Sequence, residues 1–289
     1  MKRNLGEVFR EIRESKNLKL LDVCGADLSL SQLSRFERGK CEISANKLFY
    51  ALEKINVSVE EYILAINGYQ ENYIDELFSK LNEYHLQNNV KMMKLLLKKE
   101  QNNNKYSEKS IYKEMNCLLI SVRIQQIDPT FIIYNNAKEK LIDYLVSVND
   151  WGYYELQVFS SVLIYLEFQT LIILAKEIIS KYGFYKKIPK CKSIVLEVLI
   201  KIIFICIDGN HFKNAAYLIK KVENLLESEM DLYEKNLFNY VKGYYYLKNT
   251  EREKGKQLMN TTINIFEKLG CYNLSSYYKE KLDLVFLKS

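Results

Sequence analysis

Proline, glycine and long apolar runs are scarce in this chain. Its 289 residues include two prolines and ten glycines, the residues that most often interrupt helices, so long continuous helices are expected. Residues 193–207 come nearest to a membrane span, but they contain Glu197 and Lys201 and predict a buried core helix. The N-terminal residues lack the apolar segment of a secretory signal. We therefore expect a cytoplasmic protein with no membrane partner.

Histidines and paired cysteines are also scarce. His85 and His211 are the two histidines, and the six cysteines include no Cys-x-x-Cys pair, which argues against a zinc site or a disulfide framework. Cys41, between Lys40 and Glu42, is predicted to be exposed, and a reactive or intersubunit thiol there stays open. We find no Gly-rich phosphate loop, and His211 lies in a turn where an exposed or capping role is favoured. We expect no catalysis, metal or cofactor.

The first part of the chain has the pattern of five short amphipathic helices over residues 1–63. Ser29, Ser44 and Ser58 precede three of them and can cap their first turns. Gly39 follows the third helix, where a left-handed residue often ends a helix. This pattern predicts a small helical domain at residues 1–66.

The rest of the chain has longer helix-period segments that recur about every 40 residues. They begin near residues 70, 107, 151, 191, 232 and 271. Each unit holds two amphipathic stretches, which suits stacked helical hairpins that bury one another's apolar faces. Gly152 and Gly243 stand beside bulky aromatic residues and are expected to let helices approach closely. The fold class expected for the whole chain is all-α, with a right-handed α-solenoid of tetratricopeptide-like hairpins at residues 67–289.

The third short helix lies in SLSQLSRFERGK, residues 29–40, which has three cations and one carboxylate. A helix-turn-helix motif places such a helix in the major groove of DNA. Leu30 could contact a thymine methyl group, Gln32 could read adenine, and Arg35 could read guanine or hold a phosphate. The flanking cations would add phosphate contacts. An ordinary solvated helix remains an equal alternative on periodicity alone.

Leu28, Leu33 and Phe36 should face inward in that arrangement, because they must hold the helix on its bundle. The local charge agrees with an anionic partner, since residues 1–40 contain nine Lys or Arg and six Asp or Glu. The candidate DNA-contacting residues are Arg10, Arg13, Lys19, Ser29, Leu30, Ser31, Gln32, Arg35, Arg38 and Lys40.

A family resemblance strengthens this interpretation. Residues 5–63 resemble the lambda-repressor-type (XRE, Cro/C1) helix-turn-helix, whose characteristic run ending Ile-Ser-Arg-x-Glu-Arg-Gly is matched within residues 29–39, with Leu33 in the isoleucine place. In that family the glutamate commonly holds the turn together, so Glu37 is expected to pair with a nearby Arg or backbone amide. The second helix, in LLDVCGADLS, lacks the usual Gln-rich opening, and fewer direct contacts are expected from it.

The resemblance extends over essentially the whole chain. The stretches LGEVFREIR, VNDWGYYEL and YEKNLFNYVKGYYYLK resemble the Rgg/GadR/MutR regulators. The resemblance implies a quorum-sensing transcriptional regulator that binds double-stranded promoter DNA as a homodimer. It also implies that a short hydrophobic signalling peptide binds the repeat domain. The rival hypothesis is a repeat-domain interaction protein that sequesters a partner protein, with the N-terminal bundle as a docking module.

A peptide groove needs apolar pockets with a few polar groups to satisfy the peptide backbone. The first helices of several repeats have such mixed faces. For each polar group there is an equally favoured alternative: the group is solvated, or it is hydrogen-bonded to neighbouring helices inside the protein. The candidate peptide-binding residues are Asn116, Arg123, Gln157, Ser160, Ser161, Ile164, Tyr233, Asn236, Asn239 and Tyr240.

The last amphipathic segment, residues 274–287, ends in the apolar run LVFL. It could cap the final repeat or contact a second subunit, because the end of a solenoid needs a polar cap or a partner. We favour a dimer held partly through this region.

Overall fold

The computed structural model describes residues 3–103, 110–133, 136–249 and 251–287. Apart from one isolated bridge between Gly25 and Leu28, the regular structure in these ranges is entirely helical, which confirms the predicted all-α class. Backbone contacts divide the chain into two compact units, one up to Ser79 and one from Lys80. The division falls within a helix, Tyr73–Leu86, whereas the boundary predicted from the sequence lies in the turn before it.

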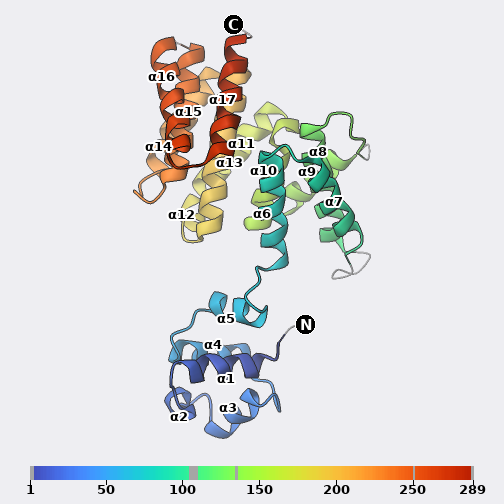
Figure 1. Cartoon of the computed structure of the whole chain (residues 1–289), viewed down its shortest axis with the longest axis vertical. Coiled ribbons are helices and arrows are strands. Elements are labelled where there is room, and N and C mark those ends of the chain that lie inside the picture. The colour runs from blue at the N-terminus through green and yellow to red at the C-terminus, as the bar shows by residue number, and fades with distance from the viewer. Residues whose placement is uncertain (1–2, 104–109, 134–135, 250, 288–289) are drawn as a thin grey trace. The chain divides into compact units, whose positions relative to one another are not determined.

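The first unit contains the five predicted short helices (Figure 1). They are α1 (Leu5–Ser15), α2 (Leu20–Val23), α3 (Leu30–Glu37), α4 (Ala45–Lys54) and α5 (Val59–Ile66). The serine caps form as expected: the side chains of Ser29, Ser44 and Ser58 accept hydrogen bonds from the first turns of α3, α4 and α5. Gly39 follows α3 with φ of +65°, which is the left-handed region that favours glycine. The ends of α3 are therefore fixed by local interactions.

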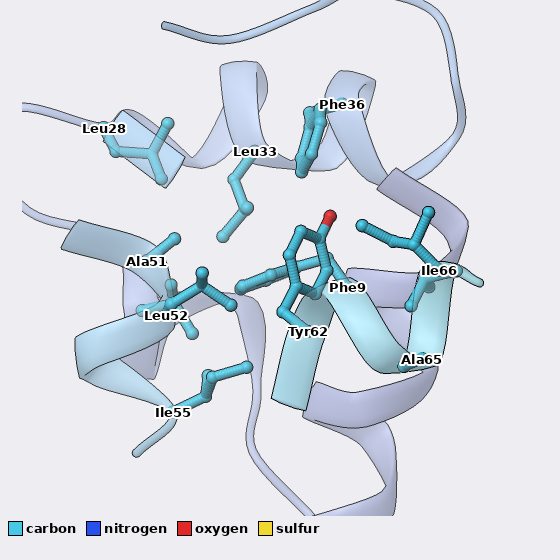
Figure 2. Close-up of a cluster of buried hydrophobic side chains, with 12 residues drawn as sticks. Phe9, Leu28, Leu33, Phe36, Ala51, Leu52, Ile55, Tyr62, Ala65 and Ile66 are labelled. Carbon is cyan, nitrogen blue, oxygen red and sulfur yellow. The ribbon is translucent and has the colours of Figure 1, made fainter. Parts of the chain in front are cut away.

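One hydrophobic core joins these helices (Figure 2). Leu28, Leu33 and Phe36 are buried as predicted, and they anchor α3 and the turn before it. Each such side chain contributes on the order of 2 kcal/mol when fully buried. Phe9 of α1 packs against the Phe36 ring with centroids 6.2 Å apart. Because α3 is held by its apolar side, its polar side is left at the surface.

Gly6 allows α1 to approach α3 very closely. A Cβ atom at this position would lie 1.8 Å from the backbone oxygen of Phe36 and 2.5 Å from its carbonyl carbon. Both atoms belong to the backbone, so a flexible side chain cannot move aside to make room. Glycine is therefore required for this helix pairing.

The second unit, with the helix that leads into it, is a series of longer helices (Figure 1). They are α6 (Tyr73–Leu86), α7 (Val90–Gln101), α8 (Ile111–Ile127), α9 (Ala137–Ser147), α10 (Tyr153–Val162), the 3-10 turn η1 (Leu163–Tyr165), α11 (Phe168–Ser180), α12 (Tyr182–Tyr185), α13 (Pro189–Asp208), α14 (Phe212–Leu225), α15 (Leu232–Asn249), α16 (Arg252–Lys268) and α17 (Tyr272–Leu287). The starts of α6, α8, α10, α13, α15 and α17 follow the recurrence predicted from the sequence. Consecutive helices pack as hairpins, with α7 on α8, α13 on α14 and α15 on α16.

Helix α13 is the apolar segment that most resembled a membrane span. Eleven of its side chains are buried in the second unit, which agrees with the core helix predicted from Glu197 and Lys201. Within the described residues, no helix combines the length and the apolar character that crossing a membrane requires.

The two glycines predicted to bring helices together behave differently. Gly243 lies where α15 meets α16, and a Cβ there would be 2.8 Å from the carbonyl oxygen of Gly255. That expectation is confirmed. Gly152 instead precedes α10, where its amide donates to the Glu155 carboxylate at 2.8 Å, and a Cβ would have room. The expectation for Gly152 is wrong, because aromatic neighbours in sequence do not specify which side of the backbone is crowded.

Candidate functional site

The first candidate surface is the polar side of α3. Ser31 and Arg35 are exposed, and Leu30 keeps 43% of its surface accessible. The Ser29 hydroxyl accepts the Gln32 amide hydrogen at 3.3 Å and lies 3.4 Å from the Ser31 hydroxyl. Short polar groups and one apolar side chain are thus gathered at the start of a rigidly anchored helix, and the Arg35 guanidinium lies in its last turn. This arrangement suits contact with base edges in a major groove.

Gln32 is held by two neighbours from outside α3. Its Oε1 accepts a hydrogen bond from Lys47 Nζ of α4 at 2.7 Å. The Cys41 thiol lies 3.7 Å from its backbone oxygen, within reach of a weak S–H hydrogen bond. Cys41 is half-buried against the core, so the prediction that it is exposed is wrong. The reason is that the chain after Gly39 turns back along α3.

The first unit also has exposed cationic side chains. Arg10 is exposed and pairs with Glu14 at 2.8 Å, while Lys19 and Lys40 are exposed. The Arg38 guanidinium donates to the backbone oxygen of Ser34 at 3.0 Å and to its hydroxyl at 3.1 Å. Arg38 therefore folds over the end of α3 while its side chain remains exposed. These four exposed cations are available for contacts with phosphates.

Arg13 does not belong with them. It is 5% exposed, and its Nε and Nη2 donate to the Glu37 carboxylate at 2.7 and 2.8 Å. Its Nη1 donates to the backbone oxygen of Leu18. The hydrogen bond and charge of Glu37 raise the pKa of Arg13. The structure therefore contradicts the prediction that Arg13 contacts DNA, because its guanidinium is buried and occupied within the protein. It confirms the expected structural role of Glu37, which ties α3 to α1.

The second candidate site is a cavity of about 310 Å³ within the repeat unit. Side chains from α6, α8, α13, α15 and α17 line it. Its apolar wall contains Leu86, Ile200, Phe204, Leu237 and Leu274. Its polar wall contains Asn82, Glu83, His85, Arg123, Glu197, Lys201, Tyr233, Tyr277, Tyr278 and Lys281. Sequence positions almost 200 residues apart meet here.

Two of the cations in the polar wall are Arg123, which is buried, and Lys201, which is half-buried. Arg123 is 7% exposed, and its Nη2 donates to Asn82 Oδ1 at 3.1 Å, while its Nε has no hydrogen-bond partner. Burial lowers the pKa of Arg123 to about 10. Lys201 donates to the Ser160 hydroxyl at 2.9 Å. Burial and the nearby Arg123 charge lower its pKa to about 8.

The side chains that face Arg123 and Lys201 neutralise their positive charge incompletely. Burial raises the pKa of Glu197, which weakens its ability to act as a full counter-charge. Burial, together with the charges of Arg123 and Lys201, lowers the pKa of His85 to about 3. His85 is therefore neutral near pH 7, and its Nδ1 has no hydrogen-bond partner. The polar wall thus offers unsatisfied polar atoms and a local positive charge beside the apolar wall of the same cavity.

A second cavity of about 510 Å³ adjoins the first, with Phe204 and Lys281 shared between their walls. Tyr240, Tyr244, Asp208 and Leu284 also line it. The Tyr244 hydroxyl donates to the Asp208 carboxylate, and the Tyr240 hydroxyl donates to the backbone oxygen of Tyr278 at 2.7 Å. The walls of the two cavities together contain both apolar and polar side chains.

Only some of the predicted peptide-binding residues lie in these walls. Arg123 and Tyr233 line the first cavity, and Tyr240 lines the second. Ser160 is not part of either wall, but its hydroxyl accepts a hydrogen bond from Lys201, which lines the first cavity. Ile164 and Asn239 are exposed, and neither belongs to the two walls.

The other four predicted residues are buried in helix packing. Asn116 donates to Glu100 at 2.8 Å and accepts from the Tyr154 hydroxyl at 2.8 Å. The remaining three are Gln157, Ser161 and Asn236. They bond mainly to neighbouring helical groups: Gln157 to Tyr153, Ser161 to the Gln157 backbone, and Asn236 to the Thr262 backbone. The alternative of internal satisfaction applies to Asn116, Gln157 and Ser161, whereas the Oδ1 atom of Asn236 is buried without a hydrogen-bond partner.

The sequence interpretation missed most of the polar wall. His85 had no distinguishing neighbours, and Lys281 lies in a helix that we considered mainly for assembly. Glu197 and Lys201 were the available indication, because two charges in an otherwise apolar helix need a polar environment. Among the residues that the structure describes, no group of three or more His, Cys, Asp or Glu side chains could hold a metal ion.

An anchored helix-turn-helix unit followed by a helical repeat unit with an internal cavity defines a class of two-part regulatory proteins. Residues 93–280 match the family described as the C-terminal domain of the HTH-type transcriptional regulator Rgg. The chain belongs to the Rgg family of transcriptional regulators.

Solved structures agree with this assignment. The SHP pheromone receptor Rgg2 of Streptococcus dysgalactiae is 32% identical, with 96% of this chain and 98% of that chain covered and a TM-score of 0.78. A protein of Listeria monocytogenes shares the fold at 22% identity, with 100% and 99% covered and a TM-score of 0.85. PrgX, in its complex with cCF10, shares the fold at 16% identity, with 97% and 99% covered and a TM-score of 0.68.

Proposed function

We propose that this regulator binds double-stranded promoter DNA as a homodimer and is controlled by a short hydrophobic signalling peptide in its repeat unit. Such a protein would work in the cytoplasm as a quorum-sensing receptor. The relative with 32% identity is a pheromone receptor, and the PrgX structure is a complex with cCF10. The observation that carries the peptide proposal is the partnerless Nε of buried Arg123 in a cavity that also has an apolar wall.

The α3 surface supports the DNA part of the proposal. Three buried side chains fix the helix. Its start presents the exposed Leu30 and the half-buried Gln32, and its last turn presents the exposed Arg35. The exposed cations supply sequence-independent affinity for phosphates. One helix-turn-helix unit buries too little surface for a specific site, so two copies on a roughly two-fold symmetric sequence are expected.

The two cavities support the peptide part. A hydrophobic peptide can place side chains against Ile200, Phe204 and Leu237. Its backbone or a carboxylate can satisfy the free N–H groups of the polar wall, since a buried donor without a partner costs free energy. Arg123 and Lys201 favour an anionic group at this end.

DNA binding is tested by selecting from a randomised duplex pool and measuring affinity at two salt concentrations. Gln32→Ala should relax the preference at one base pair, because it removes a base-edge contact. Arg38→Ala should weaken binding to all sequences and reduce the salt dependence by about one unit of slope. Selection of no sequence, with only weak and sequence-blind binding, would instead favour the docking-module hypothesis.

Peptide binding is tested by isothermal titration with synthetic hydrophobic peptides encoded by small open reading frames beside the gene. Arg123→Met should weaken binding on the order of tenfold, because it removes hydrogen bonds to a charged or polar peptide group. Asn239→Ala is the matched control, since Asn239 is exposed outside both cavity walls. Equal affinities of the two variants would exclude the first cavity as the peptide site.

A further inference from the structure

Lys47 gives Gln32 a hydrogen-bonding character that a free glutamine lacks. Lys47 Nζ lies 2.7 Å from Gln32 Oε1. An ammonium group has donors and no acceptor, so the side-chain atom facing it must be the amide oxygen. The amide nitrogen of Gln32, with its two N–H donors, is therefore the end that remains unengaged by Lys47.

Both members of this pair are held by the protein interior. The neighbours of Gln32 and Lys47 in sequence, Leu33 and Leu48, pack in the core of the first unit. The backbone amides of Gln32 and Lys47 also donate to the capping hydroxyls of Ser29 at 3.3 Å and Ser44 at 3.5 Å. Gln32 and Lys47 are each half-buried. The contact therefore links the starts of α3 and α4, where both helix backbones are fixed.

Among the described residues, Lys47 forms no ion pair. No carboxylate therefore competes with Gln32 for its ammonium group. Its remaining N–H groups stay available beside the Gln32 amide. The pair as a whole thus presents N–H donors from two side chains and a positive charge. A free glutamine presents one donor group and one acceptor.

The two purines differ in the group that this pair would meet. In the major groove adenine offers the N7 acceptor and the N6 amino donor, whereas guanine offers two acceptors, N7 and O6. Reading adenine requires Gln32 Oε1 to accept from the N6 amino group. Lys47 already donates to that oxygen, and its positive charge repels the amino hydrogens. Guanine O6 is instead attracted to both the amide N–H and the ammonium.

We propose that Lys47 is a specificity-determining residue, and that the Gln32–Lys47 pair selects guanine where an isolated glutamine would select adenine. The inference rests on the proposed DNA-binding function. It replaces the adenine contact that the sequence alone suggested for Gln32. Lys47 thereby joins the DNA-reading surface although it lies outside α3.

The decisive variant is Lys47→Met, which keeps an apolar stem for packing and removes the ammonium. In duplex selection, wild-type protein should choose guanine at one position of each half-site. Lys47→Met should change that position alone towards adenine, because Oε1 is released. Competition between duplexes that differ at this base pair should show the guanine-to-adenine affinity ratio falling on the order of tenfold.

Three further variants separate this effect from general electrostatics. Lys47→Arg retains donors and charge and should keep guanine. Lys40→Met removes an exposed cation elsewhere and should weaken all sequences without changing the base. Gln32→Ala should lose the preference at that position. Lys47→Ala serves as a second test if Lys47→Met does not fold, with circular dichroism as the check on folding.

The outcomes distinguish this inference from the proposed function. If wild-type protein selects no sequence, both are wrong. If it selects a specific operator but prefers adenine, or if Lys47→Met and Lys47→Ala keep the wild-type preference, the Gln32–Lys47 inference is wrong and DNA binding stands. A uniform loss of affinity in Lys47→Met, equal to that of Lys40→Met, would make Lys47 a phosphate contact and overturn its role in base selection.

Discussion

At the scale of single residues, the charges that matter most are the buried ones. Arg13 and Glu37 form a two-point ion pair between α1 and α3, shielded from solvent. Breaking one half of such a pair leaves the other charge buried without a partner, which costs more than the pair itself contributes. The pair therefore makes the orientation of α3 depend on two side chains that never need to touch DNA.

Glu37→Ala should destabilise the first unit by about 3 kcal/mol, because it leaves Arg13 unpaired. Replacing both residues in Arg13→Met/Glu37→Leu should cost much less, since no charge stays buried. Hydrogen exchange of amides in α1 and α3 measures the stability of this unit directly. A double variant as unstable as Glu37→Ala would show that the lost packing, and not the unpaired charge, dominates.

His85 should make the repeat unit sensitive to acid. Its pKa in the folded chain is about 3, whereas an unfolded imidazole titrates near 6.5. As the pH falls below about 6.5, the unfolded chain takes up a proton that the folded chain does not, so the free energy of unfolding falls. Between pH 7.5 and 5.5 this contribution is about 1 kcal/mol.

Urea unfolding followed through Trp151, which packs on Phe159 in the repeat unit, measures this loss. His85→Gln should remove it. His211→Gln is the matched control, because His211 is exposed and stacks on Phe168 with centroids 3.6 Å apart. Equal pH dependence in both variants would rule out His85 as the source.

At the scale of elements, the fit between α15 and α16 depends on the absence of side chains. A Cβ on Gly255 would lie 2.4 Å from the Leu247 backbone nitrogen and 2.5 Å from the Gly243 oxygen. These neighbours are backbone atoms, so the helices must separate to accommodate a methyl group. The close approach also brings Met259 of α16 into the wall of the second cavity.

Gly255→Ala should therefore lower stability by about 1 to 3 kcal/mol, even though alanine favours helix. Gly183→Ala is the control in the same unit, because a Cβ there would meet nothing within 4 Å. Gly183→Ala should leave the free energy of unfolding unchanged or raise it by up to about 1 kcal/mol. Thermal unfolding of the two variants measures the difference, and equal midpoints would refute the close-packing argument.

Local signals made many elements predictable from the sequence. The serine caps fixed the starts of α3, α4 and α5 because each cap involves residues three apart in the chain. The apolar period located the long helices for the same reason. The sequence places the end of the second helix near Gly25, where glycine often follows a helix, but α2 ends at Val23. Short helices depend more on tertiary packing than on local propensity.

The cavity was far less predictable, because it is made by tertiary contacts. His85, Arg123, Lys201 and Lys281 come from four helices, and no local pattern connects them. Their importance comes from burial, which a sequence period does not measure. Asn116 shows the converse error: a polar residue on a mixed helix face proved to be satisfied by Glu100 and Tyr154.

At the scale of the whole molecule, α17 combines two proposed tasks. It supplies Leu274, Tyr277, Tyr278 and Lys281 to the first cavity and Leu284 to the second. Cutting the chain before α17 would therefore remove cavity wall as well as any subunit contact. A point substitution is a cleaner test of the proposed dimer, because it alters at most one side chain of a cavity wall.

Leu284→Arg should shift the protein from dimer towards monomer, because it places a charge in the apolar region proposed to meet the second subunit. Leu284 is 53% exposed, so the subunit itself should tolerate the change. Leu269→Arg is the control, since Leu269 is 71% exposed just before α17. Light scattering at one protein concentration measures the mass. A fully dimeric Leu284→Arg variant would exclude this part of α17 from the interface.

The contact between Gly6 and the Phe36 backbone oxygen also sets how this protein can evolve. Every substitution of this glycine adds at least a Cβ atom, and even the methyl group of alanine would overlap the backbone of Phe36 in α3. Nearby surface positions can drift gradually through similar amino acids, but position 6 has no intermediate. A lineage could change it only after the two helices had already moved apart, so position 6 should accept fewer substitutions than the exposed positions of α3.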